Sequence, residues 1–98
     1  MITDLYDLLE AVSGPDTFLE LVRALVADRE DAAEAEAANP SSPYGRDAGG
    51  WENVQIGSFL ESAVAWAEAS DFGTKQGVPK DNPWRQFATF LYCGKIYE

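Results

Sequence analysis

The sequence predicts an all-α protein: a compact bundle of about four helices in a single domain that spans residues 1–98. Apolar residues recur at helical spacing in four separate segments, turn-forming residues separate those segments, and no convincing strand pattern occurs. The hydrophobic share of 46% is that of a folded globular chain. An antiparallel arrangement is the economical way to bury four apolar faces.

The first two predicted helices lie in the N-terminal third. The first has its apolar face at Leu5, Leu8, Leu9 and Val12, and Thr3 is placed to cap its start. The sequence Ser-Gly-Pro-Asp at residues 13–16 is a break. The second helix follows, with Asp16 or Thr17 as its cap. Its apolar face comprises Phe18, Leu21, Val22, Leu25 and Val26.

Residues 27–38, ADREDAAEAEAA, contain strong helix formers and no large apolar side chain. We expect the second helix to continue beyond the core into water and to end before Asn39-Pro40. Residues 39–50, NPSSPYGRDAGG, are predicted to be a flexible loop rich in Pro, Gly and Ser. This loop is longer than most helix–helix connections, so it is either mobile or functional.

The third predicted helix has an apolar face at Ile56, Phe59, Leu60, Ala63, Val64 and Ala67, with Trp66 at its margin. Ser58 and Glu61 match a capping box, but the inclusion of Ile56 in the face favours Asn53 as the cap. Residues 71–81 are a second loop.

The last predicted helix begins at Asn82-Pro83, the preferred pairing of N-cap and first helical residue, and runs to about Tyr97. Its main face is Trp84, Phe87, Ala88 and Leu91, widened by Phe90 and Tyr97. Gly94 weakens a helix by ~1 kcal/mol relative to Ala, so we expect it to permit close approach of another helix.

The charge of the chain argues against several classes of partner. Seventeen acidic and seven basic residues give a net charge of −10. Residues 1–38 hold ten acids and two bases, Arg23 and Arg29, which is −8 in that part alone. Such a chain repels nucleic-acid phosphates and anionic membranes, so neither is an expected partner. The charge suits solubility and a cationic partner.

The cellular location expected from the sequence is the cytoplasm. No apolar run approaches the ~20 residues that cross a bilayer. The N-terminus lacks the basic start and apolar stretch of a secretory signal. The single cysteine, Cys93, cannot form an internal disulfide framework.

Catalytic and metal-binding chemistry has little support in the sequence. There is no histidine, the commonest general base and zinc ligand, so no enzyme activity, cofactor or metal is expected. Cys93 is interpreted as a packing residue. Asp28, Asp31 and Glu34, with Glu30 beside them, lie roughly on one helical face. They could hold Mg²⁺ or Ca²⁺ if another element added oxygens, but a solvated face is the favoured interpretation.

The segment Gly-Gly-Trp-Glu-Asn at residues 49–53 is either an exposed binding turn or the start of the third helix. We favour the second interpretation, in which the glycines permit the turn and Trp51 plugs the end of the bundle. Glu52 and Asn53 would then satisfy the free N–H groups and the positive pole of that helix.

Three segments carry a resemblance to a known family: WEN, FLESAVAWAE and NPWRQFATFLYCGKIYE. The sequence resembles a family of small bacterial proteins of unknown function that carries a W-E-N turn, an F-L-E-A-type helix ending near A-W, and a C-terminal P-x-W-x-x-F-A-x-x-L-Y run. The matching positions are Trp51, Glu52, Asn53, Phe59, Leu60, Glu61, Ala65, Trp66, Trp84, Phe87, Ala88, Leu91, Tyr92, Lys95, Tyr97 and Glu98. The resemblance implies no activity or catalytic residue.

These features predict a non-enzymatic bacterial protein that binds another protein. The most concrete form is an immunity- or antitoxin-like protein that masks a basic partner. The candidate partner-binding residues are Asp28, Glu30, Asp31, Glu34, Glu36, Trp51 and Glu52. The alternative is a regulatory or structural subunit that self-associates through aromatics near Trp51 and Tyr97. A divalent-metal protein or carboxylate enzyme comes third. The sequence leaves the oligomeric state open.

Overall fold

The computed structural model describes residues 4–39 and 49–97, and within them the chain is helical with no strand. The elements are α1 (Leu5–Glu10), α2 (Pro15–Ala38), α3 (Ile56–Ser70), the short 3₁₀ helix η1 (Thr74–Gln76) and α4 (Pro83–Ile96). The predicted all-α fold of four α-helices is therefore confirmed. Thr3 and residues 40–48 of the predicted loop lie outside the described residues.

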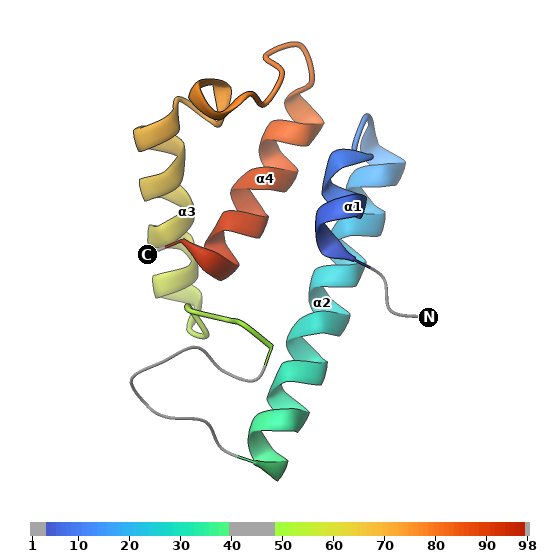
Figure 1. The fold of residues 1–98 in the computed structure, drawn as a ribbon, viewed down its shortest axis with the longest axis vertical. Helices are drawn as coiled ribbons and strands as arrows, with labels where there is room; N and C mark the ends of the chain where they lie inside the picture. The colour runs from blue at the N-terminus through green and yellow to red at the C-terminus, as the bar shows by residue number, and fades with distance from the viewer. Residues whose placement is uncertain (1–3, 40–48, 98) are drawn as a thin grey trace.

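Helix α4 is the centre of the arrangement (Figure 1). Helix α3 packs along one side of α4, and the α1–α2 hairpin packs along the other. In the described part of the chain, α2 and α3 do not pack against each other. The Cα atoms extend over 42 × 31 × 18 Å, so the molecule is flat. The surface of α4 between α2 and α3 is thus left without a covering helix.

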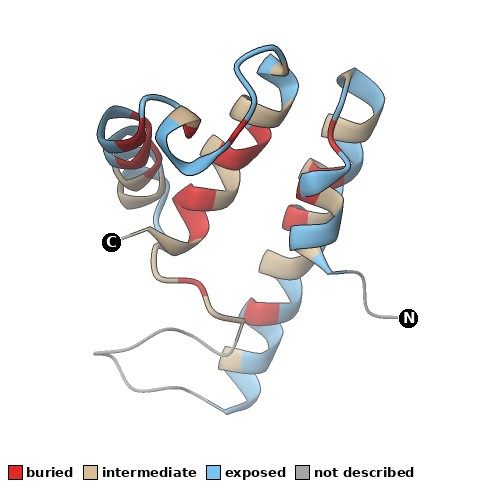
Figure 2. Ribbon diagram, turned by 45° about the horizontal axis from the view of Figure 1, so that its top comes forward, coloured by how far each residue is buried: buried red, intermediate tan, exposed pale blue. Residues whose placement is uncertain are grey.

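The apolar interior forms two clusters that share α4. The larger joins α1, α2 and α4, and its buried members are Leu9, Val12, Leu21, Leu25, Ala32, Trp51 and Ala88. The smaller joins α3 and α4 through Trp66, Ala67 and Cys93. Figure 2 shows buried positions on α4 and on the elements at both of its sides. Helix α4 holds the two halves together because each half buries its apolar face against it.

The starts of α1 and α2 differ from prediction. Asp4, and not Thr3, is the N-cap of α1, and its Oδ1 accepts the Tyr6 N–H at 2.9 Å. Helix α2 begins two or three residues earlier than predicted, with Gly14 as N-cap and Pro15 as the first residue. Thr17 lies inside the helix, where its hydroxyl oxygen accepts N–H groups from the turn at residues 13–14. The sequence rule for caps failed here because Pro at the first position fixes the boundary.

The predicted extension of α2 is confirmed as helix, since α2 reaches Ala38. It is not wholly solvated, however, because Ala32 is buried and Asp28 is half-buried. Conversely Val26, predicted to be core, is 53% exposed. Beyond Leu25 the inward face of the helix therefore continues through small and polar residues, which the search for large apolar side chains did not detect.

The buried face of α3 was predicted only in part: Ala63 and Ala67 are buried as expected, but Ile56, Leu60 and Val64 are not. The buried face comprises Ala63, Trp66, Ala67 and Ser70, with Phe59 half-buried beside them. Ile56, Leu60 and Val64 are exposed, Ile56 by 82%. Trp66 lies at the centre of the contact with α4 and not at its margin, and its indole N–H donates to Gln76 Oε1 at 2.9 Å. The large indole outweighs the aliphatic ridge because it removes more apolar area from water.

Neither predicted cap of α3 is used. The N-cap is Gln55, which makes no side-chain capping bond, and the Ser58 hydroxyl donates to the Gln55 carbonyl at 3.1 Å. Asn53 lies before the helix and bonds elsewhere, to the end of α4. The start of α3 is therefore only weakly capped.

Helix α4 begins as predicted. Asn82 is its N-cap, accepting the Arg85 N–H at 3.1 Å, and the same amide donates to the Val12 carbonyl at 2.8 Å. One side chain therefore caps α4 and ties it to the α1–α2 turn. Ala88 is buried as expected, but Trp84 and Phe87 are exposed.

Gly94 permits a close approach, as predicted. A Cβ atom at this position would lie 2.8–2.9 Å from three carbons of the Phe59 ring on α3. The approach is therefore that of an aromatic ring of α3 onto the backbone of α4.

No helix in the described ranges is both long and apolar enough to cross a bilayer.

The substitution Gly94→Ala tests the contact between Gly94 of α4 and the Phe59 ring of α3. Alanine gains up to ~1 kcal/mol in helix propensity, but overpacking against a ring costs roughly 1–3 kcal/mol. We expect a net loss of about 1 kcal/mol in the free energy of unfolding, measured by urea denaturation. Gly57→Ala in α3 is the matched control because nothing lies within 4 Å of its added Cβ. Equal stability of Gly94→Ala and wild type would contradict the packing role, whereas addition of Phe59→Leu should restore part of the loss.

Candidate functional site

Trp51 lies between α2, α3 and α4, and this junction is called the hub below. The Trp51 ring is 6% exposed and stacks on Phe59 of α3, with ring centroids 6.2 Å apart. Two cations lie near the ring: Arg29 Cζ at 5.5 Å and Lys95 Nζ at 5.4 Å from its centroid. The prediction that Trp51 plugs the end of the bundle is confirmed.

An ion pair fixes this hub to α2 and α4. Asp28 Oδ2 accepts Lys95 Nζ at 2.7 Å and the Trp51 indole N–H at 2.9 Å. The side chains of Lys95 and Asp28 are 10% and 32% exposed, so the pair is partly shielded from water. One carboxylate oxygen thus satisfies two buried donors from different elements, as polar groups in an interior require.

The two glycines bring the chain to this hub. Gly49 lies directly on α2, where an added Cβ would be only 2.5 Å from the Ala32 Cβ. Gly50 has φ of +80°, a backbone conformation that favours glycine. Gly50 permits the turn, as the sequence suggested, and Gly49 in addition permits close approach to α2.

Residues 52–53 cap the C-terminus of α4 and not the N-terminus of α3. The Glu52 N–H donates to the Lys95 carbonyl at 3.0 Å. The Asn53 amide donates to the carbonyls of Gly94 at 3.1 Å and Tyr97 at 2.9 Å. The last carbonyls of a helix need such donors. Glu52 and Asn53 were therefore rightly expected to cap a helix, but they cap the C-terminus of α4 and not the N-terminus of α3.

An apolar groove lies between α2 and α3. One part, of about 330 Å³, lies between α2 and the opposite elements, with Trp51 between them. Its lining residues are Val22, Leu25, Val26, Arg29 and Glu30 of α2, Phe59 of α3 and Leu91 of α4. A second part, of about 370 Å³, shares Arg29, Trp51 and Phe59 and extends to Val54, Ile56 and Leu60. The exposed large apolar side chains of this groove are Val26, Val54, Ile56 and Leu60.

The predicted partner-binding residues fall into two groups. Glu30, Asp31 and Glu34 are exposed on α2, and Glu30 also lines the groove. Asp28 and Trp51 are engaged in the internal contact described above, and Glu36 and Glu52 are half-buried, each with a further interaction in the chain. The structure therefore brings only three of the seven residues together on an open surface.

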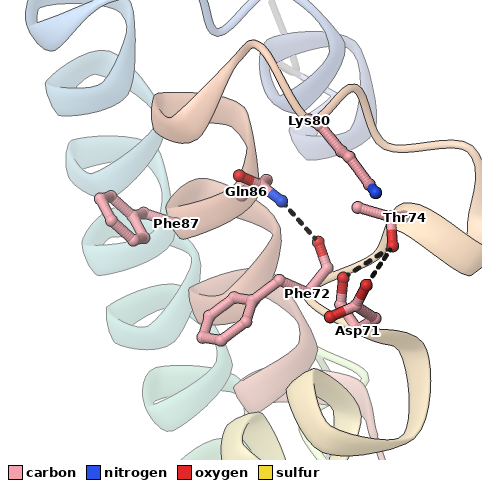
Figure 3. A pocket seen from close by; sticks show the side chains of 6 residues that line it. All are labelled: Asp71, Phe72, Thr74, Lys80, Gln86 and Phe87. Carbon is pink, nitrogen blue, oxygen red and sulfur yellow. Dashed lines mark hydrogen bonds between the residues drawn. The ribbon is translucent and has the colours of Figure 1, made fainter.

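A second pocket, of about 340 Å³, lies where the loop after α3 meets α4 (Figure 3). Its polar groups hold the loop in place: the Thr74 hydroxyl donates to Asp71 Oδ2 at 3.0 Å, and Gln86 Nε2 donates to the Phe72 carbonyl at 3.3 Å. Phe72 stacks on Phe90, with centroids 6.0 Å apart. Phe87 lines this pocket one helical turn from Leu91, so the pocket adjoins the α2–α3 groove along α4.

Metal-ligating side chains do not converge in the described part of the chain, where no three of Cys, Asp and Glu could hold one ion. Asp28, one member of the carboxylate set considered for Mg²⁺ or Ca²⁺, is turned to Lys95 instead. Cys93 is buried between α3 and α4, and burial raises its pKa to about 11. Its interpretation as a packing residue agrees with this placement.

A family model described as "Family of unknown function (DUF7660)" matches residues 15–98. The chain belongs to this family. No curated protein and no solved structure shows a significant match. The resemblance read from the sequence is thereby confirmed as membership of a family of unknown function.

The DUF7660 match includes the whole of the candidate groove. It begins at Pro15, the first residue of α2, and so contains α2, the segment at residues 49–53, α3 and α4, while α1 precedes it. Helix α1 packs against α2 and α4 and does not contact α3. The elements that form the groove are therefore the elements common to the DUF7660 pattern.

The groove was missed because its walls were assigned to the core. Val26 and the ridge at Ile56, Leu60 and Val64 satisfy the apolar spacing of a buried face, yet they are exposed. A signal was present in α3, which carries two apolar faces: one with Trp66 and small residues, the other purely aliphatic. A helix with two apolar faces can bury one and present the other.

The Asp28–Lys95 pair predicts a structural role for Asp28. Asp28→Asn leaves the charge of Lys95 without a carboxylate in a shielded site, and we expect a loss of about 2 kcal/mol in the free energy of unfolding. Asp31→Asn, on the exposed side of the same helix, removes the same charge and should change stability by less than about 0.5 kcal/mol. Urea denaturation of both variants measures the difference, and similar values would refute the assignment.

The raised pKa of Cys93 predicts low thiol reactivity. A thiol with pKa of about 11 is roughly 0.1% thiolate at pH 8, against roughly a quarter for a free cysteine. Alkylation by iodoacetamide at pH 8 should therefore be at least about a hundredfold slower in the folded protein than in urea. The stability that burial of the neutral thiol provides is present below its unfolded pKa and is lost as pH rises towards 11. A thiol-counting time course at pH 8 provides the test, and equal rates would contradict the burial.

Proposed function

We propose that this DUF7660 protein is a non-enzymatic protein-binding module of the bacterial cytoplasm that masks a basic partner. In its most concrete form it is immunity- or antitoxin-like. The observation that carries this proposal is an open acidic surface on α2, comprising Glu30, Asp31 and Glu34, next to the uncovered apolar groove. Hereafter these three residues are called the α2 acidic surface.

Charge supports a basic partner. The chain carries −10 overall, and the α2 acidic surface places three carboxylates within five residues of one exposed helix face. Such a field accelerates association with a cationic protein and suppresses association with acidic ones. Attraction of this kind weakens with salt, as the Debye length falls from ~30 Å at 0.01 M to ~10 Å at 0.1 M.

The internal use of Asp28 sharpens the proposal. Since Asp28 binds Lys95 and Trp51, it contributes to the stability of the fold and not to the open acidic surface. The alternative function, self-association through aromatics near Trp51 and Tyr97, is weakened because Trp51 is buried. The partner-binding set is thereby reduced to residues whose neutralisation should leave the fold intact.

The test is capture of a partner from lysate of the source organism at low salt. The triple variant Glu30→Gln, Asp31→Asn, Glu34→Gln should lose most of the capture that wild type shows at about 0.05 M salt, and wild type should lose it at about 0.5 M. The matched control neutralises three exposed acids elsewhere, Asp7→Asn, Glu10→Gln and Glu20→Gln, with the same change in net charge. Undiminished capture by the α2 variant, or equal loss in both triple variants, would dismiss the α2 acidic surface as the binding site.

A further inference from the structure

The pocket where the loop after α3 meets α4 has an apolar side and a charged side (Figure 3), and it is called the loop pocket below. The rings of Phe72 and Phe87 lie on one side, and the side chains of Asp71, Thr74 and Lys80 lie on the other. Phe72 and Phe87 are 42% and 51% exposed, so both rings have apolar surface that a ligand can remove from water. A ligand that fits both sides has an apolar body and a charged head.

The charged side of the loop pocket presents one group of each sign. Lys80 is exposed, and its ammonium makes no hydrogen bond or ion pair with any residue among 4–39 and 49–97. Asp71 accepts the Thr74 hydroxyl at Oδ2, which leaves its other oxygen as an acceptor. A simple anion would meet the Asp71 carboxylate, and a simple cation would meet the Lys80 ammonium. A head that carries an ammonium and a carboxylate uses both groups.

We propose that the loop pocket binds a small zwitterion of the α-amino acid class with a large apolar side chain. Asp71 accepts from its ammonium, Lys80 donates to its carboxylate, and its side chain lies against the rings of Phe72 and Phe87. The loop pocket shares no residue with the α2 acidic surface and takes a different class of ligand, so this site goes beyond the proposed function.

The backbone that presents Asp71 and Phe72 is unusual. Both residues are left-handed, with φ of +52° and +50°, and Gly73 follows at +84°. This conformation is disfavoured for a side chain as large as phenylalanine. The Phe72 ring nevertheless remains exposed at the pocket and is not enclosed in the core. Disfavoured backbone of this kind is typical of ligand sites, where it fixes the groups that make contact.

The local charge is compatible with a carboxylate in the ligand. Residues 71–85 hold three bases, Lys75, Lys80 and Arg85, and two acids, Asp71 and Asp81, which is +1. The whole chain carries −10. The segment that forms the loop pocket is therefore spared the repulsion that the acidic rest of the chain exerts on an anionic group.

The size of the loop pocket favours a single amino acid over a peptide. Its volume of about 340 Å³ lies near the lower limit of roughly 300 Å³ for ligand pockets. A peptide carries its two terminal charges at a separation that grows by up to ~3.6 Å per residue. A free amino acid has both charges on one carbon, so one small pocket can bind both.

The probe for the test is L-phenylalanine, titrated into the full chain while the NMR shifts of backbone N–H groups are recorded. We expect a dissociation constant of about 1 mM, with the shifts concentrated in residues 71–87. Three control ligands each lack one part of the probe: 3-phenylpropionate has no ammonium, phenethylamine has no carboxylate, and glycine has no ring. Each should bind at least about threefold more weakly.

Two results of the titration would overturn the inference. One is the absence of shifts in residues 71–87 at about 10 mM L-phenylalanine, ten times the expected dissociation constant. The other is an affinity for 3-phenylpropionate or phenethylamine equal to that for L-phenylalanine, because a site for a simple anion or a simple cation would give that result.

Charge variants assign the two ends of the ligand head. In Lys80→Gln the preference for L-phenylalanine over phenethylamine should disappear, and in Asp71→Asn the preference over 3-phenylpropionate should disappear. Asparagine tolerates left-handed backbone, so Asp71→Asn should keep the loop in place. Lys75→Gln is the matched control, because Lys75 is exposed on the same loop but does not line the pocket, and both preferences should persist. Persistence of both preferences in Lys80→Gln and Asp71→Asn would place the ligand elsewhere and overturn the inference.

A ring variant tests the apolar side. Phe87→Ala should weaken L-phenylalanine binding about threefold, since the ligand ring loses part of its apolar contact. Leu19→Ala is the matched control: Leu19 is 45% exposed on α2 and does not line the pocket, so the affinity should be unchanged. Equal affinities of Phe87→Ala and wild type would contradict the placement of the ligand. The triple variant of the α2 acidic surface should bind L-phenylalanine as wild type does, so this site and the proposed function can fail separately.

Discussion

The contact on which the structure depends is the ion pair between Asp28 of α2 and Lys95 of α4, closed by the indole of Trp51. Helix α2 is 24 residues long but α1 has only six, so the second half of α2 has no hairpin partner. The Asp28 carboxylate anchors that half to α4, and Gly49 lies on Ala32 one turn further along. Trp51 then fills the space between α2 and α3 that no helix occupies, which keeps the two walls of the groove apart.

Local sequence signals predicted most of the fold because they depend on neighbouring residues alone. Asn82-Pro83 identified the start of α4, and Gly94 identified a close approach, since each expresses a backbone requirement. The face of α3 could not be decided in this way. Two apolar faces compete there, and the outcome depends on Cys93 and Gly94 of another helix, which provide space for Trp66 and Phe59.

The candidate site was even less accessible to local reasoning. Spacing predicts which residues are apolar together, but it cannot tell that α2 and α3 both pack on α4 and not on each other. That separation is a property of the whole chain, and it converts Val26 and Leu60 from core residues into groove walls. The sequence gives the number of acidic residues directly. It does not reveal that Asp28 is used inside the fold while the α2 acidic surface stays exposed, because that depends on Lys95, which lies 67 residues further along the chain.

The same helix therefore uses carboxylates for two purposes that respond differently to conditions. The Asp28–Lys95 pair is shielded, so salt screens it weakly, whereas the α2 acidic surface is exposed and is screened strongly. A rise in salt that releases a basic partner should thus leave the anchor of α2 in place. Because the Asp28 carboxylate also binds the Trp51 indole, the position of Trp51 should persist when exposed charges are screened. In the function proposed above, a preformed surface would lose little conformational entropy on binding a partner.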